Sequence, residues 1–427
     1  MTWRGAALLA AALLVVAAGA ASPVFFVAGL SALVVIAALI VVDGRRAPGA
    51  RAVRATRDHD AILSVGVPNR VALTLRGPRA HGRVREELPD AAHASADEWR
   101  SAVPADLEYT VTPRVRGELA VGRTVARLEG PWGLGWRQLA PGAPETMQVD
   151  ADVSAVRVYE ALARRGQLAE LGVRTLRLRT EGTEFERVRD AVPDDPMRSI
   201  NWRATARTGQ LMATELMPER AQPVIICLDH GRLMGVGAGE LAKLDHAINA
   251  ALLLVHVALH SGDRAGLLAF ADTVSVTLAP RPGAAQMRRF LDAVRPLRPG
   301  ETEADYDDAL EYLSRWQRRR ALVVLFTDLL DPDQSAALVR QCIRLRRRHL
   351  PLVVTVRDPA IDDMARADPR TGSDVYSRAV ASGLLADRAA TLQVLQRSGV
   401  ATIDADARSL SPRLVNRYLE LKRRATI

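Results

Sequence analysis

The chain has 427 residues, of which 48% are hydrophobic and 25% charged, and its formal net charge is +9. A chain of this length is too long to fold around one ordinary hydrophobic core. Its composition is typical of two or three globular units with an added membrane segment. The arginines are scattered among aspartates and glutamates, which favours a solvated surface with membrane-proximal charge over a nucleic-acid-binding protein.

Two apolar segments open the chain. Residues 5–21 and 24–42 carry no charged side chain, and only Ser22-Pro23 separates them. The second segment has 19 residues, which suffices to cross a hydrocarbon core of about 30 Å as a helix. The first segment is slightly short, but tilt or local thinning of the bilayer can accommodate it. We predict a transmembrane helical hairpin over residues 1–44, with a cleaved signal peptide as the alternative.

Positive charge flanks both ends of this hairpin. Arg4 precedes the first segment, and a basic juxtamembrane linker at residues 45–60 follows the second. Because arginine concentrates on the cytoplasmic side of membranes, we predict an inner-membrane protein with two spans and a large cytoplasmic domain. Anionic lipid headgroups are expected to contact the linker arginines. These are Arg45, Arg46, Arg51, Arg54 and Arg57.

Residues 61–180 favour short strands. Polar and apolar residues alternate with period two over residues 70–76, 107–115 and 124–128, and glycine and proline punctuate the pattern. A helical pattern first appears at residues 153–165. This part of the chain is therefore predicted to form a small antiparallel β-sandwich.

Residues 223–427 alternate between apolar strands and helices. Runs that are apolar throughout indicate strands covered on both faces. Repeated strand–helix units predict a mostly parallel sheet with helices on both faces, so the fold class is α/β. Strands are expected at residues 224–228, 264–271, 273–278, 321–326, 350–356 and 400–403, and helices at residues 241–260, 283–294, 304–319, 334–348, 387–398 and 412–424.

Residues 181–222 join these two predicted domains and hold the most distinctive stretch of the chain. The run DDPMRSINWRATAR at residues 194–207 places a tryptophan among arginines and aspartates, shortly before a strand that ends in an acid. We predict that Trp202 is buried between the two domains and that ion pairs fix their angle, with a partner-docking surface as the alternative. The residues concerned are Asp194, Asp195, Arg198, Ile200, Trp202, Ala206 and Arg207.

This stretch resembles the signature of a widespread bacterial family, domain-of-unknown-function family fifty-eight. Its members are membrane-anchored and carry a von Willebrand factor A-like domain. Residues 116–122 and 130–134 are similar to two further turns of the family, although Leu119 replaces an aromatic residue and Gly130 an aspartate. We expect the second turn to be an ordinary glycine-stabilised turn in which Trp132 caps the sandwich. The resemblance implies a partner-binding protein rather than an enzyme.

The predicted sheet carries three polar residues where an A-like domain binds its ion. Asp229 follows the first strand, Thr302 lies in the loop at residues 300–303, and Asp328 follows a later strand. In such sheets ligands bind beyond the carboxyl ends of the strands, at the switch in strand order. The resemblance therefore implies a metal-ion-dependent adhesion site, which begins Asp-x-Ser-x-Ser and offers the hard oxygens that suit Mg²⁺.

This motif is degenerate. Gly231 and Leu233 stand at the two serine positions, and Arg232 adds a positive charge between them. We therefore predict no bound metal and no other cofactor, with Mg²⁺ on the three polar residues above as the alternative. Arg232 or His230 can instead bind a carboxylate of a partner. The predicted binding site consists of Asp229, Gly231, Arg232, Thr302 and Asp328.

Genes of this family commonly neighbour those of MoxR-type AAA+ ATPases. The resemblance thus implies a membrane-tethered, non-catalytic adaptor that binds such an ATPase during assembly or maturation of an envelope complex. Walker-type, His-Glu-x-x-His and Gly-x-Ser-x-Gly motifs do not occur in the sequence, which agrees with a protein that is not an enzyme. Two alternatives are an Mg-dependent hydrolase that uses Asp229 and Asp328, and a basic nucleic-acid-binding membrane protein.

Overall fold

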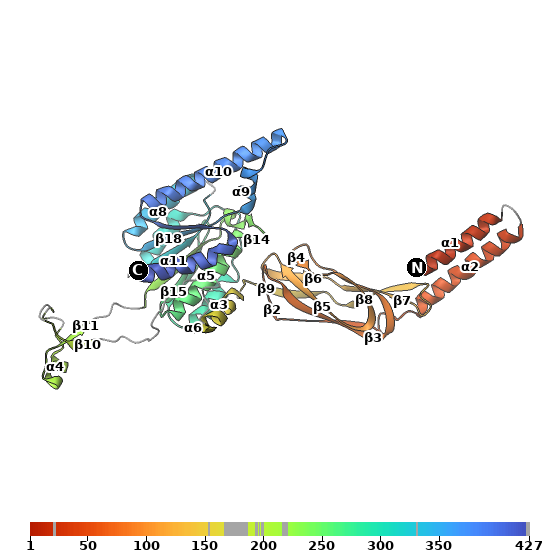
Figure 1. Cartoon of the computed structure of the whole chain (residues 1–427), viewed down its shortest axis with the longest axis horizontal. Coiled ribbons are helices and arrows are strands. Elements are labelled where there is room, and N and C mark those ends of the chain that lie inside the picture. Colours follow the sequence, from red (N-terminus) through yellow and green to blue (C-terminus); the bar gives the residue numbers. More distant parts are fainter. Residues whose placement is uncertain are drawn as a thin grey trace. The chain divides into compact units, whose positions relative to one another are not determined.

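The protein is described by a computed structural model, in which the chain divides into two compact units, Met1–Asp152 and Val153–Ile427 (Figure 1). The predicted α/β class with apolar helices, a largely antiparallel β domain and a mostly parallel sheet is confirmed. The structure describes residues 1–19, 23–152, 154–165, 187–192, 195, 197, 200–215, 221–329 and 332–423.

Two apolar helices begin the first unit. These are α1 (Trp3–Ala18) and α2 (Pro23–Arg46), which pack side by side (Figure 1). A side chain on Gly29 would lie 2.6 Å from the Val16 backbone nitrogen, so glycine permits this close approach. With 24 residues, α2 is long and apolar enough to cross a membrane, whereas α1 has 16. A span by α1 and the cytoplasmic orientation stay predictions.

A carboxylate near the end of α2 holds the adjoining turn of the β domain. Asp43 is fully buried, and it accepts hydrogen bonds from the backbone N–H groups of Trp132, Leu134 and Gly135 at 2.9, 2.7 and 2.9 Å. The expectation that Trp132 caps the sandwich is wrong, because its side chain is 45% exposed and its ring lies 4.9 Å from the Arg46 guanidinium carbon. The turn at residues 130–135 therefore anchors the helices to the β domain.

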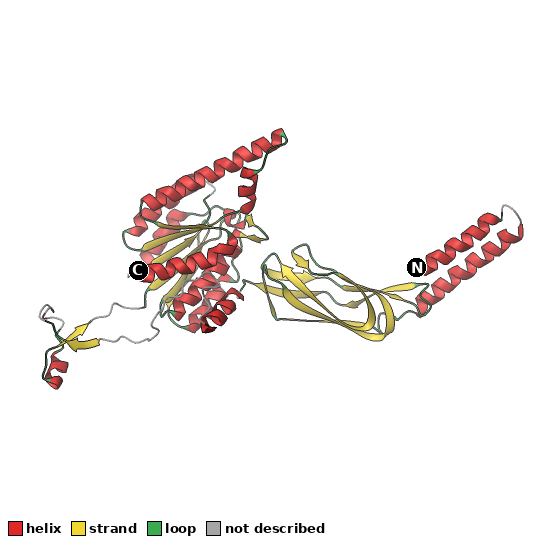
Figure 2. Ribbon diagram, viewed as in Figure 1, coloured by secondary structure: helices red, strands yellow, loops and turns green. Residues whose placement is uncertain are grey.

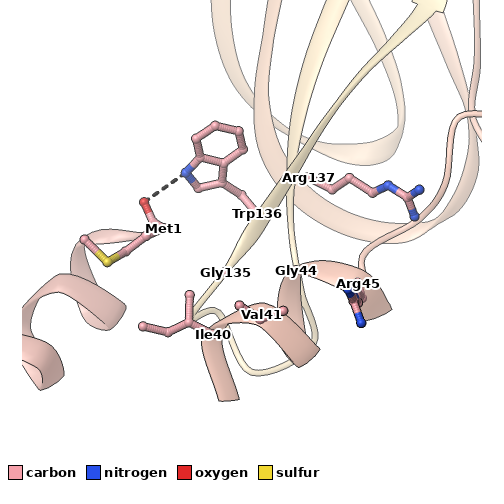
Figure 3. Close-up of a pocket in the computed structure, with 8 residues that line it drawn as sticks. All are labelled: Met1, Ile40, Val41, Gly44, Arg45, Gly135, Trp136 and Arg137. Atoms are coloured by element: carbon pink, nitrogen blue, oxygen red, sulfur yellow. Dashed lines mark hydrogen bonds between the residues drawn. The ribbon is translucent and has the colours of Figure 1, made fainter. Parts of the chain in front are cut away.

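The start of α1 completes this junction. The Trp136 Nε1–H donates to the Met1 carbonyl at 2.9 Å (Figure 3), and the Thr2 hydroxyl donates to the Gly133 carbonyl at 2.6 Å. A cavity of about 380 Å³ lies here, and none of the predicted site residues lines it. Its walls are Met1, Ile40, Val41, Gly44, Arg45, Gly135, Trp136 and Arg137.

The β domain contains two sheets. The larger has the order β4-β5-β3-β7-β8, with β1 also paired to β3, and the smaller has the order β2-β9-β6, in which β2 and β9 are parallel. The strands are β1 (Arg54–His59), β2 (Ile62–Ser64), β3 (Asn69–Glu86), β4 (Ala92–Ala94), β5 (Glu98–Pro113), β6 (Gly117–Val121), β7 (Thr124–Glu129), β8 (Trp136–Gly142) and β9 (Glu145–Asp150).

Two strands are much longer than expected. β3 has 18 residues and β5 has 16, so the expectation of short strands throughout is wrong. The dipeptide Gly77-Pro78 is typical of a turn, but β3 continues through it, with a register shift between Leu75 and Ala80. Such bulges tolerate glycine and proline within a strand.

The linker arginines do not share one environment. The Arg57 side chain is 4% exposed and pairs with Glu86 at 2.7 Å inside the β domain. It also donates to the Gly122 carbonyl at 2.7 Å. The expectation that Arg57 contacts lipid headgroups is therefore wrong, and this residue stabilises the β domain instead.

The second unit is built on a six-stranded sheet of order β16-β15-β12-β17-β18-β19. All neighbours are parallel except β15 and β16, which confirms the mostly parallel sheet. Strand order reverses between β12 and β17, so the switch point of the sheet lies there. The strands are β12 (Pro223–Asp229), β15 (Arg264–Phe270), β16 (Val274–Arg281), β17 (Leu322–Phe326), β18 (Leu350–Val356) and β19 (Ala401–Ala405).

Helices cover both faces of this sheet (Figure 2). Buried residues of α7, α8 and α10 pack with Ile225 and Cys227 on one face, whereas α5 contacts both α6 and α11 on the other. α9 is additional to the predicted helices, and α10 begins fifteen residues earlier than expected at a Thr371–Asp374 capping box. The helices are α3 (Ser154–Arg165), α5 (Lys243–His260), α6 (Ala284–Val294), α7 (Tyr306–Trp316), α8 (Pro332–Arg346), α9 (Pro359–Arg366), α10 (Gly372–Arg397) and α11 (Ala407–Arg423).

Replacing Asp43 by alanine is expected to lower the stability of the first unit. Three backbone N–H groups would lose their acceptor, of which that of Gly135 is buried and those of Trp132 and Leu134 are partly buried. The loss at a buried group costs about 1–3 kcal/mol. We therefore expect the full chain in detergent to unfold at a clearly lower temperature. Asp90→Ala, at an exposed position of the same unit, is the matched control. Equal melting temperatures for the two variants would show that Asp43 does not hold the junction.

Candidate functional site

Asp229 ends β12 at the switch point and is buried. Its Oδ1 accepts a hydrogen bond from the Gly231 N–H at 2.8 Å. Its Oδ2 accepts from the Thr327 hydroxyl at 2.6 Å and the Tyr306 hydroxyl at 3.2 Å. Thr327 follows β17 and Tyr306 begins α7, so three segments supply neutral donors to one carboxylate.

Burial sets the protonation of this group. It raises the pKa of the Asp229 carboxyl, although the hydrogen bonds from Thr327, Gly231 and Tyr306 oppose the rise. Burial also raises the pKa of the Tyr306 hydroxyl well above its ordinary value, so this phenol stays protonated and donates. The arrangement holds Asp229 in a fixed position rather than presenting it to solvent.

Asp328 lies two residues after β17, the other strand of the switch point. Two cationic side chains contact its carboxylate. Its Oδ2 accepts from the Lys243 ammonium at 2.5 Å, and its Oδ1 accepts from the Arg388 Nη1 at 2.7 Å. The Lys243 side chain is 1% exposed and that of Asp328 is fully buried. Arg388 also donates to Asp404 Oδ1 through Nη2 at 2.7 Å. A chain of alternating charge therefore runs from the buried Lys243 through Asp328 and Arg388 to Asp404, whose side chain is 25% exposed.

Arg388 stays protonated. Burial alone would lower the pKa of this guanidinium, but the negative charges of Asp328 and Asp404 outweigh that effect and raise it. Lys243 belongs to the first turn of α5, whereas Arg388 lies within α10. Because α5 and α10 cover opposite faces of the sheet, Asp328 connects both helix layers at the carboxyl ends of the strands.

Of the remaining predicted site residues, Arg232 and Thr302 lie at the exposed rim of this edge, whereas Gly231 is buried. The Arg232 N–H donates to the Thr302 carbonyl at 2.7 Å, and the Arg232 Nη2 lies 2.7 Å from Glu303 Oε1. The side chains of Arg232 and Glu303 are 56% and 50% exposed. A side chain on Gly231 would lie 3.1 Å from the Thr302 carbonyl. The structure thus brings Gly231, Arg232 and Thr302 together at the turn after Asp229.

His230 is less suited than Arg232 to bind a partner's carboxylate. Its Nε2 lies 2.8 Å from the Ser275 hydroxyl, and its carbonyl accepts from the Gly300 N–H at 2.6 Å. Burial lowers the pKa of the imidazole, which favours the neutral form near pH 7. Of the two candidate donors, Arg232 is the exposed cation.

The donor set fits a divalent ion poorly. Mg²⁺ requires near-octahedral oxygen coordination, but both oxygens of Asp328 already accept hydrogen bonds from buried cations. The oxygens of Asp229 accept from neutral donors, and no serine hydroxyl is present at positions 231 and 233. Among the described residues, no cluster of three or more histidines, cysteines or acids is placed to hold a metal.

The cysteines offer no alternative chemistry. Cys227 in β12 and Cys342 in α8 are both buried thiols. Burial raises the pKa of the Cys342 thiol to about 12 and also raises that of Cys227. Neither thiol forms the nucleophilic thiolate near neutral pH.

Several residues of the site were missed by sequence reasoning. Lys243 could have been found, because it is the one lysine or arginine of a mostly apolar helix, where an unpaired ammonium would be costly to bury. Tyr306 and Thr327 carried a weaker signal, since each lies next to a predicted strand or helix boundary. Arg388 and Asp404 carried none, because arginines and aspartates are frequent throughout the sequence.

The signature stretch forms a small structure of its own. β10 (Arg187–Asp190) and β11 (Met212–Glu215) pair antiparallel, and α4 (Trp202–Thr208) lies between them in the sequence. Ile200 bridges to Ala213, and the Asp195 Oδ2 accepts from the Val192 N–H at 2.9 Å.

The predicted burial of Trp202 is wrong, because its side chain is 60% exposed. Asn201 caps α4 through its side chain, so Trp202 occupies the first helical position. Ala206 and Arg207 are also exposed. Asp194 and Arg198 lie outside the described residues, so their predicted ion pairs stay predictions.

Comparison with known families agrees with the resemblance seen in the sequence. Residues 187–375 match the family described as "Protein of unknown function DUF58". This range contains the signature residues and all five predicted binding residues. The similarity to domain-of-unknown-function family fifty-eight is therefore confirmed over these residues.

Curated relatives include uncharacterized proteins of mycobacteria. Rv1480 of Mycobacterium tuberculosis and Mb1516 of Mycobacterium bovis are each 28% identical to this chain over 170 residues. The match covers 39% of this chain and 52% of each relative. The chain therefore spans about half the length of these relatives.

Two solved structures are also similar over part of the chain. The conserved hypothetical protein BatB from Bacteroides thetaiotaomicron is 14% identical to this chain, with a TM-score of 0.32. The aligned region includes 48% of this chain and 100% of the BatB structure. A cohesin module from a family 33 glycoside hydrolase of Clostridium perfringens is 12% identical, with a TM-score of 0.16, and covers 23% and 96%.

Replacing Asp229 by asparagine is expected to remove a pH dependence. Because the pKa of Asp229 is raised in the folded state, the folded protein binds this proton more tightly than the unfolded chain does. The stability that this group contributes is therefore present at acid pH and lost as the pH rises. The free energy of unfolding of the parent, minus that of Asp229→Asn, should fall as the pH rises above about 4, the ordinary pKa of an aspartate. Denaturant unfolding at several pH values tests this, and a difference that rises or stays constant would contradict it.

Proposed function

We propose that this protein is a membrane-tethered, non-catalytic adaptor whose α/β domain binds a protein partner at the carboxyl edge of its sheet. One observation carries the proposal. The buried acids at the switch point are bound by groups of the same chain, whereas the surrounding rim is exposed and charged. This pattern supports recognition by the rim rather than chemistry by the acids.

The acids are poorly placed for catalysis. A metal-dependent hydrolase needs open coordination positions for its ion, its water and its substrate. Asp328 accepts hydrogen bonds from Lys243 and Arg388, and Asp229 accepts them from Thr327 and Tyr306. These contacts favour the adaptor over the hydrolase that uses Asp229 and Asp328.

The rim has the properties of a recognition surface. Arg232 and Glu303 form an exposed ion pair, and such pairs contribute little to folding stability. Glu301 and Thr302 beside them are exposed as well. Charged groups at the rim of an interface speed association and select the partner, because complementary charge attracts and like charge repels.

The partner is proposed to be a MoxR-type AAA+ ATPase. This choice of partner is supported by the match of residues 187–375 to the family, because genes of this family commonly neighbour those of such ATPases. ATP hydrolysis would then take place on the partner, during assembly or maturation of an envelope complex. The exposed residues Trp202 and Arg207 of α4 offer a second contact region for the same partner.

Membrane attachment is proposed to be through α2, with α1 as a second span. α2 ends with Arg45 and Arg46 in its last turn. Arginines at this place favour a cytoplasmic end of the span, which would place both folded domains in the cytoplasm beside the inner membrane.

Reversing the charge of Arg232 is expected to weaken partner binding. The full chain, solubilised in detergent, would be used to capture proteins from the lysate of its own cells with ATP and Mg²⁺, and mass spectrometry would identify AAA+ ATPases. Arg232→Glu should reduce retention of the ATPase about tenfold or more, which corresponds to about 1.4 kcal/mol.

Arg347→Glu is the matched control, because Arg347 is also exposed but lies just before the amino end of β18. It should retain the ATPase like the parent. Retention of no AAA+ ATPase by the parent would remove this partner, and equal retention by both variants would place its contact away from the rim.

A further inference from the structure

The buried charge chain lies at the place where the resemblance implies a divalent ion. We propose that the Lys243 ammonium and the Arg388 guanidinium permanently replace this ion, so that the carboxyl edge of the sheet keeps its shape without a metal. The inference concerns the α/β domain alone and does not depend on which partner binds there.

Geometry is the first support. A bound ion at such a site would join acidic residues that follow different strands. Here Asp328 is joined to α5 by Lys243 at 2.5 Å and to α10 by Arg388 at 2.7 Å. Arg388 continues to Asp404 of β19 at 2.7 Å. The two cations thus connect four separate elements, as a shared metal ion would.

Charge balance is the second support. Asp328 and Asp404 carry two negative charges, and Lys243 and Arg388 carry two positive charges. Arg357, whose Nε lies 3.7 Å from Asp404 Oδ2, adds a third positive charge, so the two acids are already fully compensated. An additional divalent ion would place two uncompensated charges beside a buried ammonium and guanidinium. Buried charges are tolerated only when they are paired, so this set excludes the ion as long as Lys243 stays in place.

The loss of the serines agrees with this replacement. A side chain on Gly231 would lie 3.1 Å from the Thr302 carbonyl and 3.2 Å from Asp229 Oδ1, so a serine there would require the loop to move. Asp229 instead accepts from the Gly231 N–H, Thr327 and Tyr306. Its lone pairs are thus bound by neutral donors, which take the place of the water and hydroxyl groups of an ion site.

Binding of Mn²⁺ by the full chain in detergent tests the proposal directly. Titration followed by electron paramagnetic resonance would compare the parent with Asp229→Asn. We expect no saturable binding that depends on Asp229, and no change in melting temperature on addition of EDTA. Saturable Mn²⁺ binding by the parent that Asp229→Asn abolishes would overturn the proposal. Binding that is equal in both proteins would lie elsewhere and agrees with it.

Lys243→Met provides the second arm. The methionine side chain is unbranched and one atom shorter than that of lysine, and the variant leaves Asp328 with one cation, so its melting temperature should fall by on the order of 10 °C. Adding Asp328→Asn in the same chain should recover part of the loss, because the uncompensated charge is then removed. A double variant no more stable than Lys243→Met, or a Lys243→Met protein as stable as the parent, would show that the ammonium does not neutralise Asp328.

If Lys243→Met fails to fold, the double variant and the Mn²⁺ titration of the parent still decide the question. Arg347→Met, at an exposed position, controls for the loss of a cation in general. The metal titration involves no partner protein. Failure of this inference is therefore distinguishable from failure of the adaptor proposal.

Discussion

The α/β domain depends on how one buried carboxylate is compensated. Asp328 lies at the end of a wholly buried strand, where an uncompensated charge would be strongly destabilising. Lys243 and Arg388 reach it from helices on opposite faces of the sheet. The same contacts that neutralise the acid therefore fix α5 and α10 against the sheet and set the shape of its carboxyl edge.

Because the buried acids are compensated within the chain, the buried and the exposed groups at the carboxyl ends of the strands have different roles. Asp229 and Asp328 face donors of their own chain, so the groups left for recognition are the exposed ones at the turn after β12 and in the loop before α7. An adaptor needs a stable scaffold that presents such a rim. In the first unit Asp43 has a comparable role, since its carboxylate joins the end of α2 to a turn of the β domain.

Much of the fold could be predicted from the sequence, because strands covered on both faces are continuous apolar runs. β18 was predicted with both of its bounds, and β12 and β17 within one residue at each end. The ends of β12 and β17 then placed Asp229 and Asp328 at the switch point. The pairs that complete the site could not be predicted, since 85 residues separate Lys243 from Asp328 and 60 separate Arg388 from it. Local patterns do not specify which of many arginines meets which acid. Trp202 was misplaced because aromatic character alone does not show on which side of a short helix a residue lies.

In this protein, cations of the chain itself occupy the place of an ion at the switch point. Anomalous diffraction from crystals of the full chain grown with Mn²⁺ can test this occupancy. We expect no anomalous peak between Asp229 and Asp328, with the Lys243 ammonium within hydrogen-bonding distance of Asp328. A manganese peak there, with Lys243 turned away from Asp328, would contradict it.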